Sequence, residues 1–155
     1  MRLDSHCVKT AIRLFNRQKA HALPLPWLRR VMKHALPLCL AAAKPGDDCV
    51  LPALPEIEAT LIDDAEIARV HGEFLDDAAP TDVITFHHGE ILVSVETAAR
   101  QAPDHGALFE HEVALYLIHG LLHLAGWHDH DPAEAHAMAE TQQRILQQCL
   151  LAVEQ

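Results

Sequence analysis

The sequence predicts one α+β domain, in which a four-stranded mixed sheet is covered by about five helices. Four short segments have the period of two that is typical of strands, and longer segments between and after them have helical spacing. Half of the 155 residues are apolar and 22% are charged, which is the balance expected of a globular domain with its own core. We therefore expect residues 1–155 to form a single domain.

The first predicted strand covers residues 8–15, where the side chains alternate between the two faces of a half-buried strand. A helix is expected over residues 27–36, because apolar side chains recur there at helical spacing opposite basic ones. Pro37 lacks the amide hydrogen that a helix interior needs, so we expect it to end or kink this helix. Residues 44–55 have a turn-like composition and predict a loop inside the domain rather than a linker.

A second strand is predicted over residues 57–62, followed by a helix that Asp63 or Asp64 can cap. This helix should end near Asp76. Its apolar residues lie at positions i, i+3 and i+7, which predicts that they form its buried stripe. They are Ile67, Val70 and Phe74.

Two further strands, over residues 83–86 and 91–95, are separated by the short segment 87–90. This loop length predicts a tight hairpin, so the two strands should be antiparallel. His87 and His88 lie in the turn and are interpreted as solvated rather than functional.

Three helices complete the predicted order βαβαββααα. They are expected at 96–102, 108–125 and 132–153. The helix at 108–125 is apolar on most of its surface, which predicts a central position in the fold. A pair of histidines on such a helix calls for an explanation.

The charge is distributed unevenly along the chain, whose formal net charge is −10. Residues 1–44 contain nine of the twelve Lys and Arg residues and one acid, whereas residues 45–155 contain three bases and twenty-one acids. The basic N-terminal part could face phosphate groups, although a basic solvated surface on an acidic protein would look the same.

Cysteine usage and hydropathy indicate where the protein works. The four cysteines form no CxxC pair, which favours a reducing, cytoplasmic setting. No apolar run reaches the ~18 residues that a membrane span needs, and the N-terminus lacks the apolar stretch of a secretory signal. An organelle transit peptide is not excluded, because the first 40 residues are rich in arginine and poor in acids.

The central helix contains a pattern typical of metal ligands. His119 and His123 are four residues apart, so their imidazoles project from one face about one turn apart. Gly126 can adopt the left-handed conformation that ends a helix, after which the chain turns back. Asp129, ten residues after His119, then matches the HxxxHxxGxxH/D sites of zincin-like metalloproteases. We predict one zinc ion on His119, His123 and Asp129, with an open position for catalysis.

The third ligand is the less certain one, because His128, Asp129 and His130 are consecutive. The spacing selects Asp129, with His130 as the alternative. The histidine that is not a ligand could transfer protons during the reaction. A set of two histidines and one carboxylate would also suit non-haem iron.

Gly120 occupies the position where metalloproteases carry the glutamate that acts as general base. Its absence argues against peptide hydrolysis. Phosphodiester cleavage fits better, because a metal ion can lower the pKa of water and neutralise charge on phosphoryl oxygens.

Three motifs in order resemble the YbeY endoribonucleases. They are Pro80-Thr-Asp-Val-Ile-Thr-Phe86, Gly89-Glu-Ile-x-Val-Ser94 and His119-Gly-x-Leu-His123-Leu-x-Gly126. The similarity covers about residues 57–135. It implies a zinc-dependent endoribonuclease, specific for single-stranded RNA, that acts in 16S ribosomal RNA 3′-end maturation and ribosome quality control in the bacterial cytoplasm. The implied partners are ribosomal RNA, the ribosome and its factors, and no membrane.

The chain departs from this family at two places. Family members commonly have histidine at the position of Asp129, so the ligand is either exchanged here or displaced onto His130. Many members also carry an arginine, implicated in activity, where this chain has Leu75. Arg69, on the same predicted helix, is the nearest substitute.

Five other residues near these motifs are interpreted as structural rather than catalytic. They are Thr81, Asp82, His111, Glu112 and Trp127. The catalytic candidates are thus His119, His123, Asp129 and His130. Two alternative functions remain open, namely a small metallopeptidase and a ribosome- or RNA-binding factor in which the metal ion is only structural.

Overall fold

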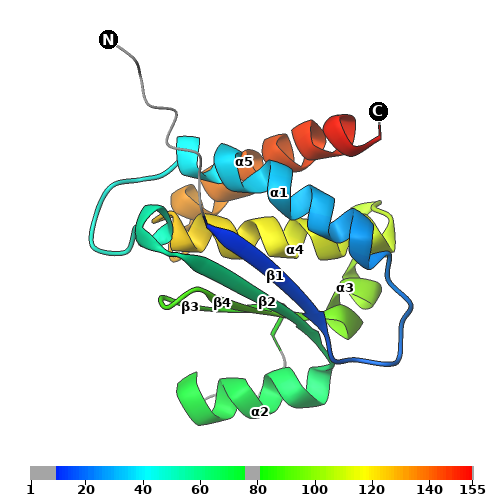
Figure 1. Cartoon of the computed structure of the whole chain (residues 1–155). Coiled ribbons are helices and arrows are strands. Elements are labelled where there is room, and N and C mark those ends of the chain that lie inside the picture. Colours follow the sequence, from blue (N-terminus) through cyan, green and yellow to red (C-terminus); the bar gives the residue numbers. More distant parts are fainter. Residues whose placement is uncertain (1–9, 76–80, 155) are drawn as a thin grey trace.

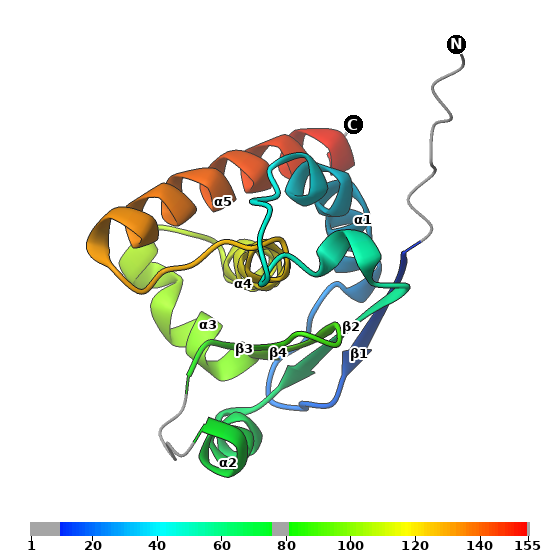
Figure 2. The same ribbon diagram turned by 90° about the vertical axis from the view of Figure 1, so that its left-hand side faces the viewer.

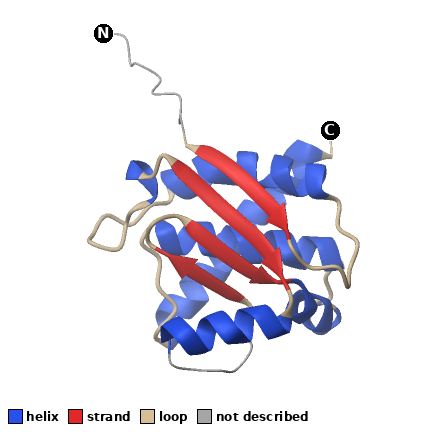
Figure 3. Ribbon diagram, turned by 60° about the horizontal axis from the view of Figure 1, so that its bottom comes forward, coloured by secondary structure: helices blue, strands red, loops and turns tan. Residues whose placement is uncertain are grey.

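The structure is a computed structural model that describes residues 10–75 and 81–154. Its sheet contains four strands in the order β1-β2-β4-β3, and β1 pairs with β2, and β2 with β4, in parallel (Figures 1 and 3). β3 lies antiparallel to β4, which confirms the predicted hairpin. The strands are β1 (Ala11–Asn16), β2 (Glu56–Ile62), β3 (Val83–Phe86) and β4 (Glu90–Ser94).

Five α-helices and two short 3-10 helices accompany this sheet within the described residues, so the predicted α+β class and the mixed four-stranded sheet are confirmed. Figure 2 shows α1, α4 and α5 on one face of the sheet and α2 on the other. The α-helices are α1 (Leu25–Ala41), α2 (Asp64–Leu75), α3 (Val95–Gln101), α4 (Phe109–Leu124) and α5 (Pro132–Val153). The 3-10 helices cover Leu51–Ala53 and Pro103–His105. None of the described helices is long and apolar enough to cross a bilayer.

Alternation along the strands divides the buried side chains into two clusters. Ile57, Ala59 and Leu61 of β2 belong to the larger cluster, which α1, α4 and α5 cover. Ile62 points to the other face, where a smaller cluster forms under α2. The predicted central position of α4 is confirmed, because it lies between the sheet and α5 and is buried along most of its length.

α1 does not end at Pro37, and Phe74 does not belong to the buried stripe of α2, so these two expectations for the helices are wrong. α1 continues through Pro37 to Ala41. Pro37 lies on the exposed side of the helix, where the carbonyl that it leaves unpaired can bond water, while Leu36 and Cys39 are buried in the core and favour continued helix. Phe74 is 65% exposed, because it lies near the C-terminal end of α2, beyond the small core that holds Ile67.

Several boundaries differ by a few residues from the expected ones. β1 ends at Asn16, and the part of the predicted strand before residue 10 lies outside the described residues. Val95 begins α3 instead of ending β4, because Ser94 caps that helix and accepts a hydrogen bond from the backbone of Thr97. Of the two possible caps of α2, Asp63 accepts the backbone hydrogen bond of Glu66 at 2.8 Å.

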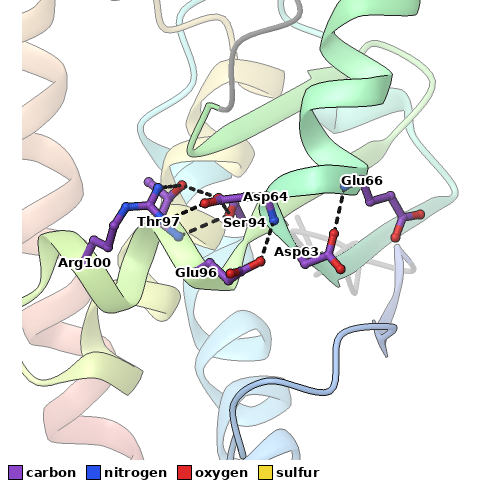
Figure 4. A network of polar contacts seen from close by, with 7 residues as sticks. All are labelled: Asp63, Asp64, Glu66, Ser94, Glu96, Thr97 and Arg100. Carbon is purple, nitrogen blue, oxygen red and sulfur yellow. Dashed lines mark hydrogen bonds and ion pairs between the residues drawn. The ribbon is translucent and has the colours of Figure 1, made fainter.

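Asp64 has a different role, in a polar network that joins α2 to β4 and α3 (Figure 4). Its carboxylate accepts hydrogen bonds from Ser94 Oγ, Thr97 Oγ1 and Arg100 Nη1. Burial of Asp64 disfavours its charged form, but these hydrogen bonds and the charge of Arg100 outweigh burial and lower the pKa of the carboxyl below its ordinary value. Glu96 in turn accepts a hydrogen bond from the backbone of Asp64.

Candidate metal centre

The two histidines of α4 face each other at its C-terminal end. The Nε2 atoms of His119 and His123 are 2.9 Å apart, and the ring planes are nearly perpendicular at 88°. The side chains are 20% and 27% exposed, although most of the helix around them is buried. The predicted spacing on one helix face is therefore present, and both imidazoles are reachable from solvent.

A Schellman turn ends α4, as the glycine in the motif predicted. Gly126 has a φ of 96°, its N–H donates to the carbonyl of His123, and the N–H of Trp127 donates to the carbonyl of Leu122. A Cβ atom on Gly126 would lie 2.3 Å from the backbone oxygen of Lys44. Both the left-handed conformation and this close approach require glycine.

The chain then returns toward the histidines and brings Asp129 to them. Asp129 Oδ2 lies 3.5 Å from His119 Nε2 and 3.7 Å from His123 Nε2. Ligand atoms bound tetrahedrally at about 2.0–2.1 Å from zinc lie about 3.3–3.4 Å from one another. The three separations found here, 2.9, 3.5 and 3.7 Å, lie on both sides of that spacing.

The neighbouring histidines are turned elsewhere. His128 Nε2 pairs with Asp48 at 3.0 Å, and His130 stacks on the ring of His128 at a centroid distance of 5.3 Å. Within the described parts of the chain, the group of side chains that could share one ion consists of His119, His123 and Asp129. The geometry favours Asp129 over His130 as the third ligand.

Hydrogen bonds on the far side of each ring orient the donor atoms. His123 Nδ1 lies 2.9 Å from the carbonyl oxygen of Trp127, which can only accept, so Nδ1 carries the proton and Nε2 keeps its lone pair. His119 Nδ1 lies 2.8 Å from Gln142 Oε1 of α5 in the same arrangement. Burial, and then the nearby His119, lower the pKa of His123 and favour its neutral form.

Two lone pairs and a carboxylate oxygen thus converge on one point, an arrangement that a cation would stabilise. These donor types fit zinc. Sequence reasoning missed Gln142, because a glutamine on a separate helix has no motif that links it to the histidines. The contact arises from the packing of α5 against α4, which the structure shows and the sequence analysis did not predict.

The loop before β2 supports the turn from outside. The backbone N–H groups of Lys44 and Val50 donate to the carbonyls of Ala125 and Leu124 at 2.9 and 2.8 Å. Trp127 Nε1 donates a hydrogen bond to the carbonyl of Ala42. The ammonium group of Lys44 lies 4.0 Å from the centre of the Trp127 ring. The loop is thus part of the domain, as predicted, and Trp127 fastens it to the end of α4.

A pocket of about 450 Å³ opens beside His123, between the end of α4 and β3. Val83 and Thr85 form part of its wall. His87, at the hairpin turn, also lines this pocket although its side chain is 62% exposed, so its position is closer to the site than expected. With His128 and His130, four imidazoles line this pocket.

Other residues near the motifs have structural contacts. Asp82 accepts a hydrogen bond from the backbone of Val83, and His111 stacks on Trp27. Glu112 is buried and bonds His105 at 2.7 Å. None of these side chains belongs to the group formed by His119, His123 and Asp129.

Gly120 is buried against β4, where a Cβ atom would lie 2.7 Å from Ile91 Cγ2. A glutamate at this position would therefore meet the sheet.

The side chain of Leu75 and residues 76–80, which include the start of the Pro-Thr-Asp motif, lie outside the described residues. Arg69 pairs with Glu73 at 3.2 Å on α2, and Figure 2 shows this helix on the opposite face of the sheet from α4. The role of Arg69 as a substitute for the family arginine stays a prediction.

The fold and the site together define an α+β protein with a histidine pair and a carboxylate converging at the end of its central helix. Comparison with known proteins identifies its family. The family model described as Endoribonuclease YbeY matches residues 13–150. The chain therefore belongs to the YbeY endoribonuclease family, as its motifs indicated.

Individual relatives agree with this assignment. Endoribonuclease YbeY of Geobacter metallireducens is 30% identical over 150 residues, covering 86% of this chain and 92% of that protein. The proteins of the same name from Gloeobacter violaceus and a Synechococcus strain are 40% and 37% identical, and the matches span 55% and 62% of their lengths. A solution structure from Thermotoga maritima superimposes with a TM-score of 0.59 at 25% identity and covers 89% of this chain and 88% of that one.

Proposed function

We propose that the protein is a metal-dependent endoribonuclease that cleaves single-stranded RNA, with one zinc ion held by His119, His123 and Asp129. The observation that carries this proposal is the convergence of three oriented donor atoms beside an open pocket. Family membership supports RNA as the substrate. We further propose that it acts in the cytoplasm on the 3′ end of 16S ribosomal RNA and in ribosome quality control, with ribosomal factors as partners.

Different residues of the site orient the metal ligands and transfer protons. Gln142 and the Trp127 carbonyl hold the protons on Nδ1 of the two histidines, so that both Nε2 atoms stay available as ligands. A zinc ion, when bound, would lower the pKa of water and neutralise charge on the phosphoryl oxygens. We assign proton transfer to the ring of His130, which lines the pocket without belonging to the ligand group.

Basic residues supply a surface for the RNA backbone. Arg29, Arg30 and Lys33 are exposed on α1, within the basic part of the sequence. Arg13 and Arg17 are also exposed, but each pairs with a glutamate, at 2.7 and 2.6 Å. RNA affinity should therefore fall as salt rises, because phosphate contacts release counterions. Affinity that is independent of salt would contradict this part of the proposal.

The test is cleavage of a labelled single-stranded RNA by the zinc-loaded protein and by the variants His119→Ala and His123→Ala. Both variants should lose activity, while circular dichroism checks that they remain folded. Matched double-stranded RNA should resist cleavage. Unchanged cleavage by both folded variants would refute the proposal.

Two alternative functions predict different results in two further assays. A metallopeptidase, favoured by the histidine pair on a helix, would cleave a casein-like substrate in a chelator-sensitive way, although Gly120 argues against it. A factor with a purely structural metal ion is motivated by Leu75 and by the aspartate in the ligand group. It would lose thermal stability on chelation without any nuclease activity.

A further inference from the structure

A second pocket of about 300 Å³ is lined by residues of α2 and of the β3–β4 hairpin. Figure 2 shows α2 on the opposite face of the sheet from α4. We call this pocket the α2 groove. Its lining combines aromatic side chains, two arginines and two glutamates with part of the small core. The residues are Arg17, Glu66, Arg69, Val70, Phe74, Phe86, His88, Glu90 and Leu92.

Three rings form a column in the α2 groove. Phe74 meets Phe86 edge to face at 5.6 Å, and Phe86 stacks on His88 at 5.5 Å with only 15° between the planes. Phe74 is 65% exposed, and the His88 side chain is 68% exposed. Exposing so much aromatic surface is unfavourable in water unless a ligand covers it. Flat nucleobases are suitable ligands, because they stack on aromatic faces in single-stranded nucleic acids.

Two guanidinium groups flank this column. Arg17 pairs with Glu66 at 2.6 Å, and Arg69 pairs with Glu73 at 3.2 Å, but both arginine side chains are about 60% exposed. Exposed ion pairs contribute little stability, and each guanidinium has more donors than one carboxylate can use. These arginines can therefore turn to phosphate groups at low cost.

The α2 groove adjoins the pocket of the metal centre across the edge strand. Along β3 and the following turn, neighbouring side chains point to opposite sides, so Thr85 and His87 line the pocket beside His123, whereas Phe86 and His88 line the α2 groove. A single strand that leaves the metal centre over the hairpin turn would reach this column of rings directly. The bases of a double helix are paired and stacked on one another, so they could not stack on these rings.

We propose that the α2 groove binds the unpaired bases of the same RNA strand whose backbone lies at the metal centre. This inference rests on the proposed function, since it takes single-stranded RNA as the substrate. It assigns base stacking to Phe74 and Phe86 and phosphate contacts to Arg69. The α2 groove thereby gives the enzyme a preference for long unpaired segments over short ones.

The test compares two fluorescein-labelled, uridine-rich RNAs of about four and about sixteen nucleotides, lengths that span the usual site sizes. Fluorescence anisotropy with the zinc-loaded full chain, at low temperature and with a gel to check that the RNA is intact, measures both affinities. Phe74→Ala should weaken binding of the long RNA at least about fivefold, because stacking on one ring contributes that much or more. The ratio of long to short affinity should fall by the same factor.

Matched controls come from the far side of the molecule. Leu151→Ala removes a side chain of α5 that is as exposed as Phe74, and Arg144→Ala removes one positive charge, as Arg69→Ala does. Both controls should bind the long RNA as the unmodified chain does. Arg69→Ala should weaken binding of the long RNA. It should also reduce the slope of log affinity against log salt concentration by the amount expected for about one phosphate contact.

The results that would overturn the proposed function differ from those that would overturn only the α2 groove. An unmodified chain that binds neither RNA would overturn the proposed function and the α2 groove together. An unmodified chain that cleaves RNA, but whose long-RNA affinity is unaffected by Phe74→Ala and Arg69→Ala, would overturn the α2 groove alone. If these variants instead lose binding of a purified ribosomal protein, the groove is a protein-docking surface and the inference is wrong.

Discussion

Replacing Gly126 by alanine should disturb both the stability of the fold and the metal centre. The left-handed conformation costs an L-residue about 1–2 kcal/mol. The new Cβ would lie 2.3 Å from the Lys44 carbonyl oxygen, so backbone must move by about 0.7 Å to reach the 3.0 Å that real Cβ atoms respect. Overpacking of this kind costs about 1–3 kcal/mol. Together, Gly126→Ala should lower the free energy of unfolding by about 2–5 kcal/mol.

Gly106 provides the matched control, because its φ is 63° and a Cβ there meets nothing within 4 Å. Gly106→Ala should therefore lose only the conformational part, about 1–2 kcal/mol. Urea unfolding of both variants measures this difference. Zinc titration against a competing chelator should detect weaker binding in Gly126→Ala alone, because only that turn positions Asp129. Equal losses of stability and equal zinc affinity in the two variants would refute the reasoning.

Three further predictions concern the site and the fold. Gln142→Leu should weaken zinc binding about 10–100-fold in a chelator competition, as loss of a ligand's hydrogen-bond partner usually does, while the exposed neighbour Gln143→Leu should leave it unchanged. Asp129→Ala should abolish stoichiometric zinc in metal analysis, whereas His130→Ala should retain zinc and lose cleavage; the opposite pattern would make His130 the ligand. Asp64→Ala should lower the free energy of unfolding by about 2–3 kcal/mol near neutral pH. Since hydrogen bonds lower the pKa of Asp64 in the folded state, its contribution is complete above about pH 4 and is lost as the pH falls through the folded value. Urea midpoints of the unmodified chain and of Asp64→Ala should therefore converge in acid, and a constant gap would contradict this assignment.

Local patterns were sufficient for much of the fold. The four strands, the five α-helices and the antiparallel hairpin follow from periods of two and 3.6 residues, which each segment carries within itself. The helix does not end at Pro37, because burial of the residues around this proline outweighs its low helix propensity. The exposure of Phe74 was not predicted, because a helical stripe does not reveal where the core beneath it ends.

At the candidate metal centre, too, the sequence predicts what is local in the chain and misses what depends on packing. His119, His123, Gly126 and Asp129 lie within eleven consecutive residues, so their geometry is local and the sequence could predict it. Gln142 and the loop around Lys44 reach the site from other elements, and only the packing of the whole chain brings them there. The position of His87 beside the pocket was missed for the same reason.

The hydrogen bond from His119 to Gln142 has a consequence for the order in which the protein matures. The three ligand side chains and the loop that supports their turn precede α5 in the chain, so the ribosome synthesises them first. The tautomer of His119, however, is set only when α5 has emerged and docked on α4. Under the proposed function, a chain that ends before α5 would carry all three proposed ligands but lack the hydrogen bond that orients His119, and we expect it to bind zinc more weakly than the full chain.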